Sequence, residues 1–149
     1  MKIADLLKKR KDTVITIHQD RSVYDAIKIL FENNIGAVLV KDDNDSLAGI
    51  VSERDILREC YRNIENLKAF KIKDMMTTNL FVGESEDDLS HVKTVMVENR
   101  IRHLPVLENE NLIGILSMRD IVEAELLNTQ LENRQLKEMM KGKDKTQNG

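Results

Sequence analysis

The sequence contains very little of several residue types, and each shortage excludes a class of protein. Its 149 residues include a single cysteine, Cys60, so no disulfide can form within the chain and a reducing compartment is favoured. Aromatic residues make up 3% of the chain, too few for a stacking platform that binds single-stranded bases. The formal net charge of −3 lacks the basic excess of a general nucleic-acid binder. We therefore expect no nucleic-acid partner.

Long apolar runs are also missing. A stretch such as Ala37 to Val40 is far too short to cross a bilayer, so we expect no membrane span. The segment from Met1 to Arg10 carries charges where a signal peptide needs an apolar centre, which predicts a cytoplasmic location. The one basic cluster, Lys8 to Lys11, could contact phosphate, but charge runs more often mark a solvated helix end. The hydrophobic content of 41% is typical of one ordinary soluble domain.

What the sequence does contain is an internal repeat. Residues 49–57, GIVSERDIL, return sixty-five positions later as residues 114–122, GILSMRDIV, with six of nine positions identical. The preceding residues align without a gap at an offset of sixty-six, and one residue is lost in a hairpin loop. A repeat of this length cannot bury its apolar face alone. We therefore predict an α/β (α+β) fold in which two pseudo-twofold-related β-α-β-β-α repeats form one compact module.

Each copy predicts a strand, a helix, two strands and a second helix. In the first copy we expect strands at 14–17, 36–40 and 47–51, with helices that begin at Ser22 and Ser52. In the second copy we expect strands at 80–82, 102–107 and 112–116, with helices at 88–99 and beyond Ser117. This organisation places the repeats at 7–62 and 79–126, a helical connector at 63–78 and a C-terminal extension at 127–149.

The last predicted helix is longer than its repeat requires. Its apolar residues recur at helical spacing at Ile121, Ala124, Leu127, Leu131 and Leu136, and continue to Met139 or Met140. The far half of this helix has too little neighbouring chain to cover its leucines, which predicts a homodimer. A frayed amphipathic tail is the alternative. The polar segment from Lys141 to Gly149 is expected to be disordered.

The Ser-x-x-Asp pattern at the start of two helices has two interpretations. A serine at the N-cap with an acid three residues later is a capping box, worth about 1 kcal/mol to the helix. Capping does not require Arg54 and Arg119, which stand at the same place in both copies. A helix N-terminus suits a phosphate, an arginine adds a charge-assisted contact, and an aspartate one turn in can accept ribose hydroxyls. The same residues therefore also predict a nucleotide site.

The two motif copies at 49–55 and 114–120, together with the Arg-His-Leu-Pro-Val run at 102–106, resemble a tandem pair of CBS domains. This cystathionine-β-synthase-type regulatory unit is also called a Bateman module, and the likeness covers residues 7–126. In that family two repeats form an α/β pair whose clefts bind AMP, ADP, ATP, S-adenosylmethionine or NAD(H). The resemblance implies an adenine nucleotide, above all AMP or ATP, as a regulatory ligand, with no metal.

The resemblance also implies roles for individual residues. Asp55 and Asp120 correspond to the ribose-binding aspartates, one in each cleft. The implied phosphate contacts are Ser52, Arg54, Ser117 and Arg119. The implied adenine pockets are Thr13, Val14 and Ile15 at the Asp120 cleft, Asn79, Leu80 and Phe81 at the Asp55 cleft, and Ala37.

The two copies differ in a way that predicts unequal clefts. Gly36 and Ala37 of the first copy correspond to Arg102 and His103 of the second, so we expect these two to bind phosphate in the Asp120 cleft. Polyphosphate should then prefer that cleft. The family's apolar-Pro step is present only in the second copy, at Leu104-Pro105, so weaker or no binding is expected at Asp55.

No catalytic or metal-binding group can be assembled from the sequence. His18 and His91 have no partner at metal-ligand spacing, and no nucleophile has both a base and an orienting group. We therefore predict a stand-alone regulatory module that is not an enzyme and that signals by a population shift to an unidentified downstream protein. The alternatives left open are a ligand-free structural dimerisation module and an enzyme.

Overall fold

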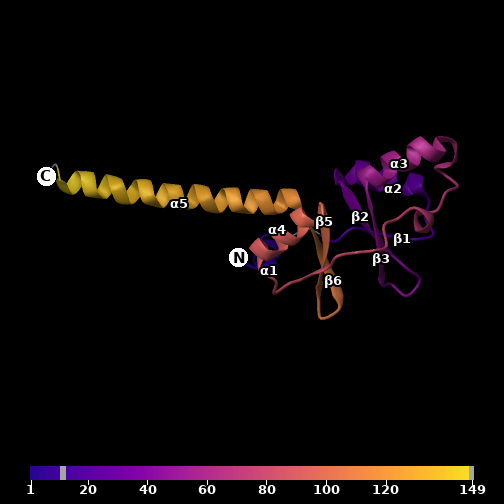
Figure 1. The fold of residues 1–149 in the computed structure, drawn as a ribbon, viewed down its shortest axis with the longest axis horizontal. Coiled ribbons are helices and arrows are strands. Elements are labelled where there is room, and N and C mark those ends of the chain that lie inside the picture. The colour runs from indigo at the N-terminus through magenta and orange to yellow at the C-terminus, as the bar shows by residue number, and fades with distance from the viewer. Residues whose placement is uncertain (11–12, 148–149) are drawn as a thin grey trace.

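A computed structural model of the chain describes residues 1–10 and 13–147, with side chains up to Lys141. It contains two three-stranded sheets with helices packed against them, and one long helix that projects away from the compact part (Figure 1). The predicted α/β pair of repeats with a long C-terminal helix is confirmed.

The first repeat follows the predicted order of elements. These are β1 (Thr16–His18), α2 (Val23–Asn33), β2 (Ala37–Lys41), β3 (Leu47–Ser52) and α3 (Glu53–Asn63). β2 lies in the middle of the sheet, parallel to β1 and antiparallel to β3. Four consecutive residues of β2 are buried, as expected for a strand covered on both faces. Helix α2 begins at the Ser22 cap and ends at Asn34, whose φ of 51° is left-handed.

The second repeat has the same topology. Its elements are β4 (Gly83–Glu84), α4 (Leu89–Glu98), β5 (His103–Glu108), β6 (Asn111–Ser117) and α5 (Met118–Gln147). The predicted strand at 80–82 is wrong by three residues, because the chain joins the sheet only at Gly83. The tail from Lys141, for which disorder was predicted, is helical as far as Gln147. Residues 148 and 149 lie outside the described residues.

The connector between the repeats is less helical than predicted. After α3 it contains two short 3₁₀ turns, η1 (Ile64–Asn66) and η2 (Ile72–Asp74). Its backbone bonds to the first repeat instead: Val23 N donates to Phe70 O at 2.9 Å, and Ile72 N donates to Arg21 O at 2.9 Å. The connector therefore completes the first repeat as well as leading to the second.

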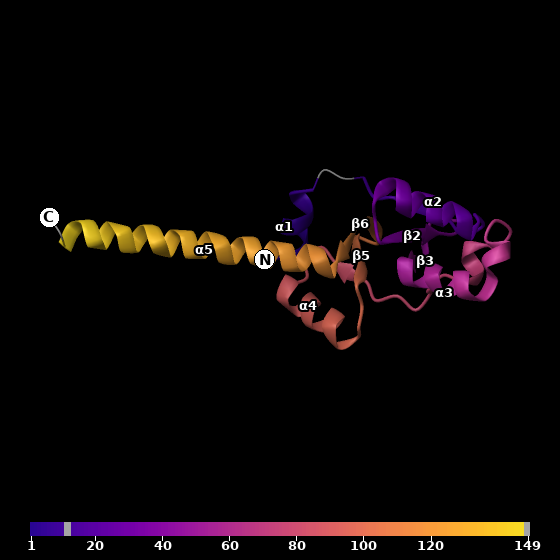
Figure 2. The same ribbon diagram turned by 90° about the horizontal axis from the view of Figure 1, so that it is seen from above.

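A lead segment before each repeat packs on the other repeat. Helix α1 (Ile3–Lys8) precedes the first repeat, yet Ile3 and Leu6 lie in the core of the second, and α1 lies beside the base of α5 (Figure 2). Ile72 is fully buried in the core of the first repeat. Residues 2–7 (KIADLL) and 71–76 (KIKDMM) match each other, a signal that the sequence analysis missed. The duplicated unit therefore includes its lead segment.

A third apolar cluster joins the two repeats. Ala37, Leu39 and Ile50 from β2 and β3 are buried together. Packed against them are Val14, Leu47, Leu80, Leu112 and Ile115, of which the last three follow the connector or belong to the second repeat. The sheets are therefore held together by apolar contact, as the repeat predicted.

Because each lead segment packs on the other repeat, we expect that shortening a buried side chain of α1 strongly lowers the stability of the protein. Ile3→Ala should lower the free energy of unfolding by about 2–5 kcal/mol, because Ile3 is completely buried among second-repeat residues. Urea unfolding measures this change, and Lys8→Ala on the exposed side of α1 serves as the matched control. A loss below about 0.5 kcal/mol for Ile3→Ala would show that α1 does not stay docked.

Candidate functional site

A cavity of about 270 Å³ opens between the two repeats at the start of α3. Its walls come from four segments: the residue before β2, the β3–α3 junction, the linker that follows η2, and the residues at the start of β5. The lining residues are Gly36, Ile50, Ser52, Glu53, Arg54, Asp55, Thr77, Asn79, Leu80, Phe81, Arg100, Ile101, Arg102 and His103. Six of the predicted site residues for this cleft are thus brought together.

Asp55 forms the predicted capping box and still leaves one oxygen for other contacts. Its Oδ2 accepts from Ser52 N at 2.9 Å and from Ser52 Oγ at 3.0 Å, while Asp55 N donates to Ser52 Oγ at 3.2 Å. Among the described residues, Oδ1 has only an ion pair with Arg58 at 3.8 Å. The capping interpretation is therefore correct, and it does not exclude a ligand at the same carboxylate.

The linker is held over the cavity by two backbone hydrogen bonds. Ile50 N donates to Thr77 O and Thr77 N donates to Ile50 O, both at 3.0 Å. Gly49 permits this approach, because a Cβ there would lie 2.7 Å from Met76 Sδ and 2.8 Å from Thr77 O. Gly49 therefore allows the linker to lie close to β3. The same linker places Leu80 and Phe81 at the cavity wall.

Arg102 and His103, which were predicted for the Asp120 cleft, line the Asp55 cavity. A Cβ on Gly36 would lie 3.4 Å from His103 Nε2, so the starts of β2 and β5 face each other. Residues so close to the pseudo-twofold axis border both clefts, and alignment alone cannot assign them to one. Burial lowers the pKa of His103, and Arg102 adds to this, whereas Asp120 and Glu53 oppose it.

The carboxylate of Asp120 is arranged differently from that of Asp55. Its Oδ2 accepts from Ser117 N at 2.7 Å, and Asp120 N donates to Ser117 Oγ at 3.1 Å. Its Oδ1 forms an ion pair with Nη2 of Arg10, and Nη1 of the same arginine donates to Ile115 O at 3.2 Å. Burial would raise the pKa of Asp120, but the bonds from Arg10 and Ser117 outweigh it and hold the pKa below its usual value.

The other residues predicted for the Asp120 cleft are dispersed. Arg119 is largely exposed and pairs with Glu123 at 3.0 Å along α5. Thr13 is exposed, while Val14 and Ile15 pack in two different apolar clusters. Ala37, predicted for an adenine pocket, is buried in the cluster between the repeats. Arg10 was missed because its basic cluster was interpreted as a solvated helix end; Lys11 lies outside the described residues.

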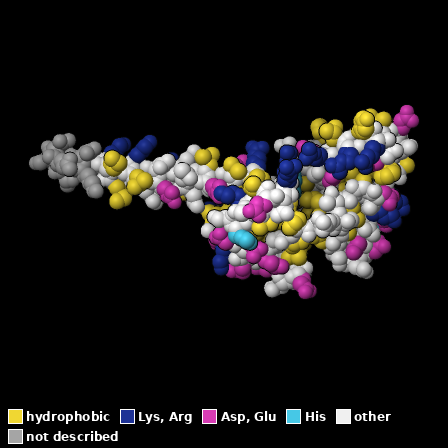
Figure 3. Space-filling view, in the orientation of Figure 1, with side chains coloured by type: hydrophobic (Ala, Val, Ile, Leu, Met, Phe, Trp, Pro, Cys, Tyr) yellow, Lys and Arg dark blue, Asp and Glu magenta, His cyan; other side chains and the backbone are white. Residues whose placement is uncertain are grey.

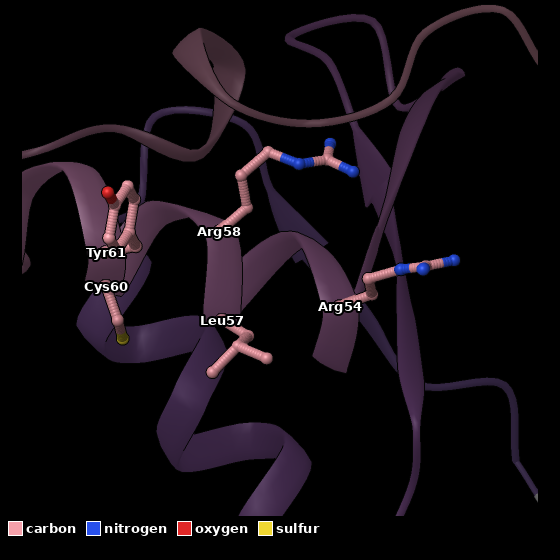
Figure 4. A pocket seen from close by; sticks show the side chains of 5 residues that line it. All are labelled: Arg54, Leu57, Arg58, Cys60 and Tyr61. Carbon is pink, nitrogen blue, oxygen red and sulfur yellow. The ribbon is translucent and has the colours of Figure 1, made fainter.

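An open hollow also runs along the outer side of α3. Figure 4 shows its side chains, Arg54, Leu57, Arg58, Cys60 and Tyr61, all from this one helix. In that view both arginines extend toward the strands, while Leu57 and Cys60 point the other way. Leu57 and Tyr61 are 72% and 93% exposed. One helix face cannot enclose a small ligand, so the cavity at Asp55 is the candidate site.

His18 has acidic neighbours that sequence spacing did not reveal. Ligand atoms of His18, Asp20 and Asp43 lie within 4.8 Å of one another. Both ring nitrogens are already engaged, since Asp20 N donates to Nδ1 at 3.1 Å and Nε2 lies 2.8 Å from Asp43. Lys73 pairs with Asp20 at 3.2 Å. This cluster is therefore a set of surface hydrogen bonds with one ion pair between Lys73 and Asp20.

Comparison with known proteins shows the family. The CBS domain model matches the chain twice, at residues 3–62 and 72–127. The chain is 37% identical over 109 residues to the mitochondrial CBS domain-containing protein CBSX3 of Arabidopsis thaliana, covering 70% of this chain and 53% of that protein. The chain thus spans about half the length of this relative.

Two solved structures of similar fold contain adenosine-type ligands. CBSX2 in complex with AMP is 28% identical, with a TM-score of 0.72, covering 86% of this chain and 98% of that one. The CBS domain pair of protein MJ0100 in complex with 5′-methylthioadenosine and S-adenosyl-L-methionine is 26% identical, with a TM-score of 0.72, covering 87% and 98%. The fold and the two repeats thus define a tandem CBS-domain pair. The chain belongs to the CBS domain family, as the resemblance predicted.

Among the described residues, no helix has both the length and the apolar character needed to span a bilayer. The predicted cytoplasmic location stays a prediction.

The burial of His103 predicts a pH dependence of stability. Its pKa is lower in the folded than in the unfolded chain, so acidification favours the unfolded state once the pH falls below the ordinary histidine value of about 6.5. The wild type should lose stability between pH 7 and pH 5 more steeply than His103→Gln, which cannot titrate. Urea unfolding at several pH values measures the difference. Parallel stability curves for the two proteins would contradict this assignment.

Proposed function

We propose that this chain is a regulatory module that binds an adenine nucleotide in the Asp55 cavity and does no catalysis itself. The observation that carries the proposal is the capped carboxylate of Asp55, with Oδ1 left beside a cavity that three arginines line. A capping acid alone requires neither the cavity nor these cations.

The walls of the cavity match the three parts of a nucleotide. Oδ1 of Asp55 can accept hydrogen bonds from ribose hydroxyls, since the capping box fixes the carboxylate in place. Ile50, Leu80 and Phe81 offer apolar surface for the adenine ring. The phosphate is then met by the cations that line the cavity, Arg54, Arg100 and Arg102.

The cavity volume favours a small adenosine ligand. About 270 Å³ lies at the lower end of small-molecule sites, which are roughly 300–1,000 Å³. A mononucleotide such as AMP suits this space better than NAD(H), and ATP would extend toward the arginines. The relatives support this ligand class, because CBSX2 is in complex with AMP and the MJ0100 domain pair with two other adenosine derivatives.

The position of the cavity between the repeats suggests how ligand binding produces a signal. Ser52 and Asp55 belong to the first repeat, whereas Arg102 and His103 lead into the sheet of the second. A ligand that contacts both shifts the population toward one relative arrangement of the repeats, by as much as its affinity differs between arrangements. The unidentified downstream protein would recognise that arrangement of the repeats or the helix α5.

Removing the Asp55 carboxylate tests the proposal. At a hundred times its dissociation constant, AMP or ATP should stabilise the wild type by about 2.7 kcal/mol, which raises the melting temperature by roughly 5–10 °C. Asp55→Ala should abolish this shift, because the ribose loses its acceptor. The exposed Asp74→Ala is a control of equal charge and should keep the shift. Melting curves with AMP, ADP, ATP, NADH and S-adenosylmethionine measure it.

The two alternatives give different results in the same experiment. A ligand-free dimerisation module would show no shift with any of the five compounds. An enzyme would consume its nucleotide during incubation, which chromatography of the mixture detects. Either result would overturn the proposed function.

We also propose that the chain forms a parallel homodimer through α5. Figure 3 shows hydrophobic side chains at intervals along this projecting helix. One stripe alternates spacings of four and three residues, as in a coiled coil: Val122, Leu126, Thr129, Asn133, Leu136 and Met140. Its four apolar members are 52–65% exposed. On either side of the stripe, Glu132 of one chain would face Lys137 of the partner subunit, a pairing that a parallel arrangement allows.

A charge placed on this stripe should separate the two chains. Leu136→Glu puts a carboxylate into the seam and should give a monomer at concentrations where the wild type is a dimer, as measured by sedimentation equilibrium. Leu131→Glu is the matched control. This leucine, one of the apolar residues from which the dimer was predicted, is 52% exposed against 57% for Leu136, but it lies outside the stripe on the opposite side of α5. A monomeric wild type, or equal effects of both substitutions, would contradict the coiled-coil dimer.

A further inference from the structure

The two clefts differ in the length of the chain that crosses them. The matched lead segments end at Leu7 and Met76. The chain next reaches the matched positions Val14 and Leu80, shortly before the first strand of each repeat. Six residues separate Leu7 from Val14, whereas three separate Met76 from Leu80. Arg10 lies in the longer linker, which the second copy cannot match.

The longer linker brings an arginine to the place that a backbone amide takes in the shorter one. In the Asp55 cleft, Thr77 N donates to Ile50 O at 3.0 Å. The equivalent carbonyl in the second repeat is Ile115 O, which accepts from Nη1 of Arg10 at 3.2 Å. The same guanidinium then reaches Oδ1 of Asp120 through Nη2.

This contact uses the last carboxylate oxygen of Asp120. Oδ2 is held by Ser117 N at 2.7 Å, as the matching oxygen of Asp55 is held by Ser52 N. Within the part of the chain that the structure describes, the other oxygen of Asp55 has only Arg58 at 3.8 Å, whereas that of Asp120 has Arg10. The Arg10 and Asp120 side chains are 29% and 21% exposed, so the pair is better shielded from solvent than an ordinary surface ion pair.

We propose that Arg10 is a built-in occupant of the Asp120 cleft, which keeps a nucleotide from the second ribose position and leaves one nucleotide site per chain. This inference rests on the proposed function of the Asp55 cavity. A ribose diol offers two neutral hydroxyls to a carboxylate, whereas Arg10 offers a charge-assisted bond from the same chain. Nucleotide must therefore displace the close Arg10 ion pair at Asp120, whereas at Asp55 it competes with the longer 3.8 Å contact of Arg58. The tandem pair is then asymmetric in ligand binding, in the opposite sense to the preference for the Asp120 cleft that the sequence predicted.

The experiment counts the nucleotides that each chain binds. Titration calorimetry with AMP should give one site for the wild type and two for Arg10→Ala, the second at least tenfold tighter than any further event in the wild type. Lys9→Ala removes an exposed neighbouring cation and should keep one site. The double substitution Arg10→Ala, Asp120→Ala should return the count to one. Arg10→Gln, which can still bond the Ile115 carbonyl, provides a second open variant if Arg10→Ala does not fold.

Each outcome separates this inference from the proposed function. Two sites in the wild type, or one site in both folded Arg10 variants, would overturn the role of Arg10 and leave the Asp55 site intact. No binding to the wild type with one site in Arg10→Ala would overturn the Asp55 site and support the role of Arg10. No binding to any variant would overturn both.

Discussion

The central interaction of this molecule is the bond between a serine amide and a carboxylate three residues later. It begins α3 and α5 in the same way, with Ser52 N and Ser117 N each donating to Oδ2 of an aspartate. The bond satisfies a main-chain donor at the helix start and fixes the rotamer of the acid. One oxygen of each aspartate is thereby used at the helix start. Asp55 also lines the cavity between the repeats, whereas the second oxygen of Asp120 pairs with Arg10. The group that lies next to the second oxygen determines whether the aspartate is open to a ligand or is paired with a side chain of its own chain.

The answer depends on the segments that cross each cleft. Buried isoleucines fix the start of both linkers, since Ile3 lies in the core of one repeat and Ile72 in the core of the other. The strands β1 and β4 fix their ends. In the first copy, Arg10 at the start of the longer linker contacts Ile115 O and Asp120.

The sequence was most informative where periodicity and capping act locally. Both hairpins, the helices after them and the capping serines follow from patterns that neighbouring residues create. It was least informative where position depends on distant chain. Alignment could not assign Arg102 and His103 to one cleft, because they lie near the symmetry axis, where the starts of β2 and β5 face each other. The lead segment was overlooked although its Lys-Ile-x-Asp pattern occurs twice, because its core lies in the other repeat. Arg10 looked like surface charge because nothing in the sequence points to Asp120.

The two carboxylates also differ in what they connect. α1 packs on the second repeat, and Asp120 begins the helix that follows the last strand of that repeat, so the Arg10 ion pair joins two parts of one packing unit. A ligand in the Asp55 cavity would instead join the first repeat to residues that lead into the second sheet. Under the proposed function, only the latter contact would change in free energy if the repeats moved relative to each other, and a ligand shifts an equilibrium only through such a difference. The Arg10 ion pair would then not oppose that motion, whereas the Asp55 cavity lies where binding and arrangement would be coupled.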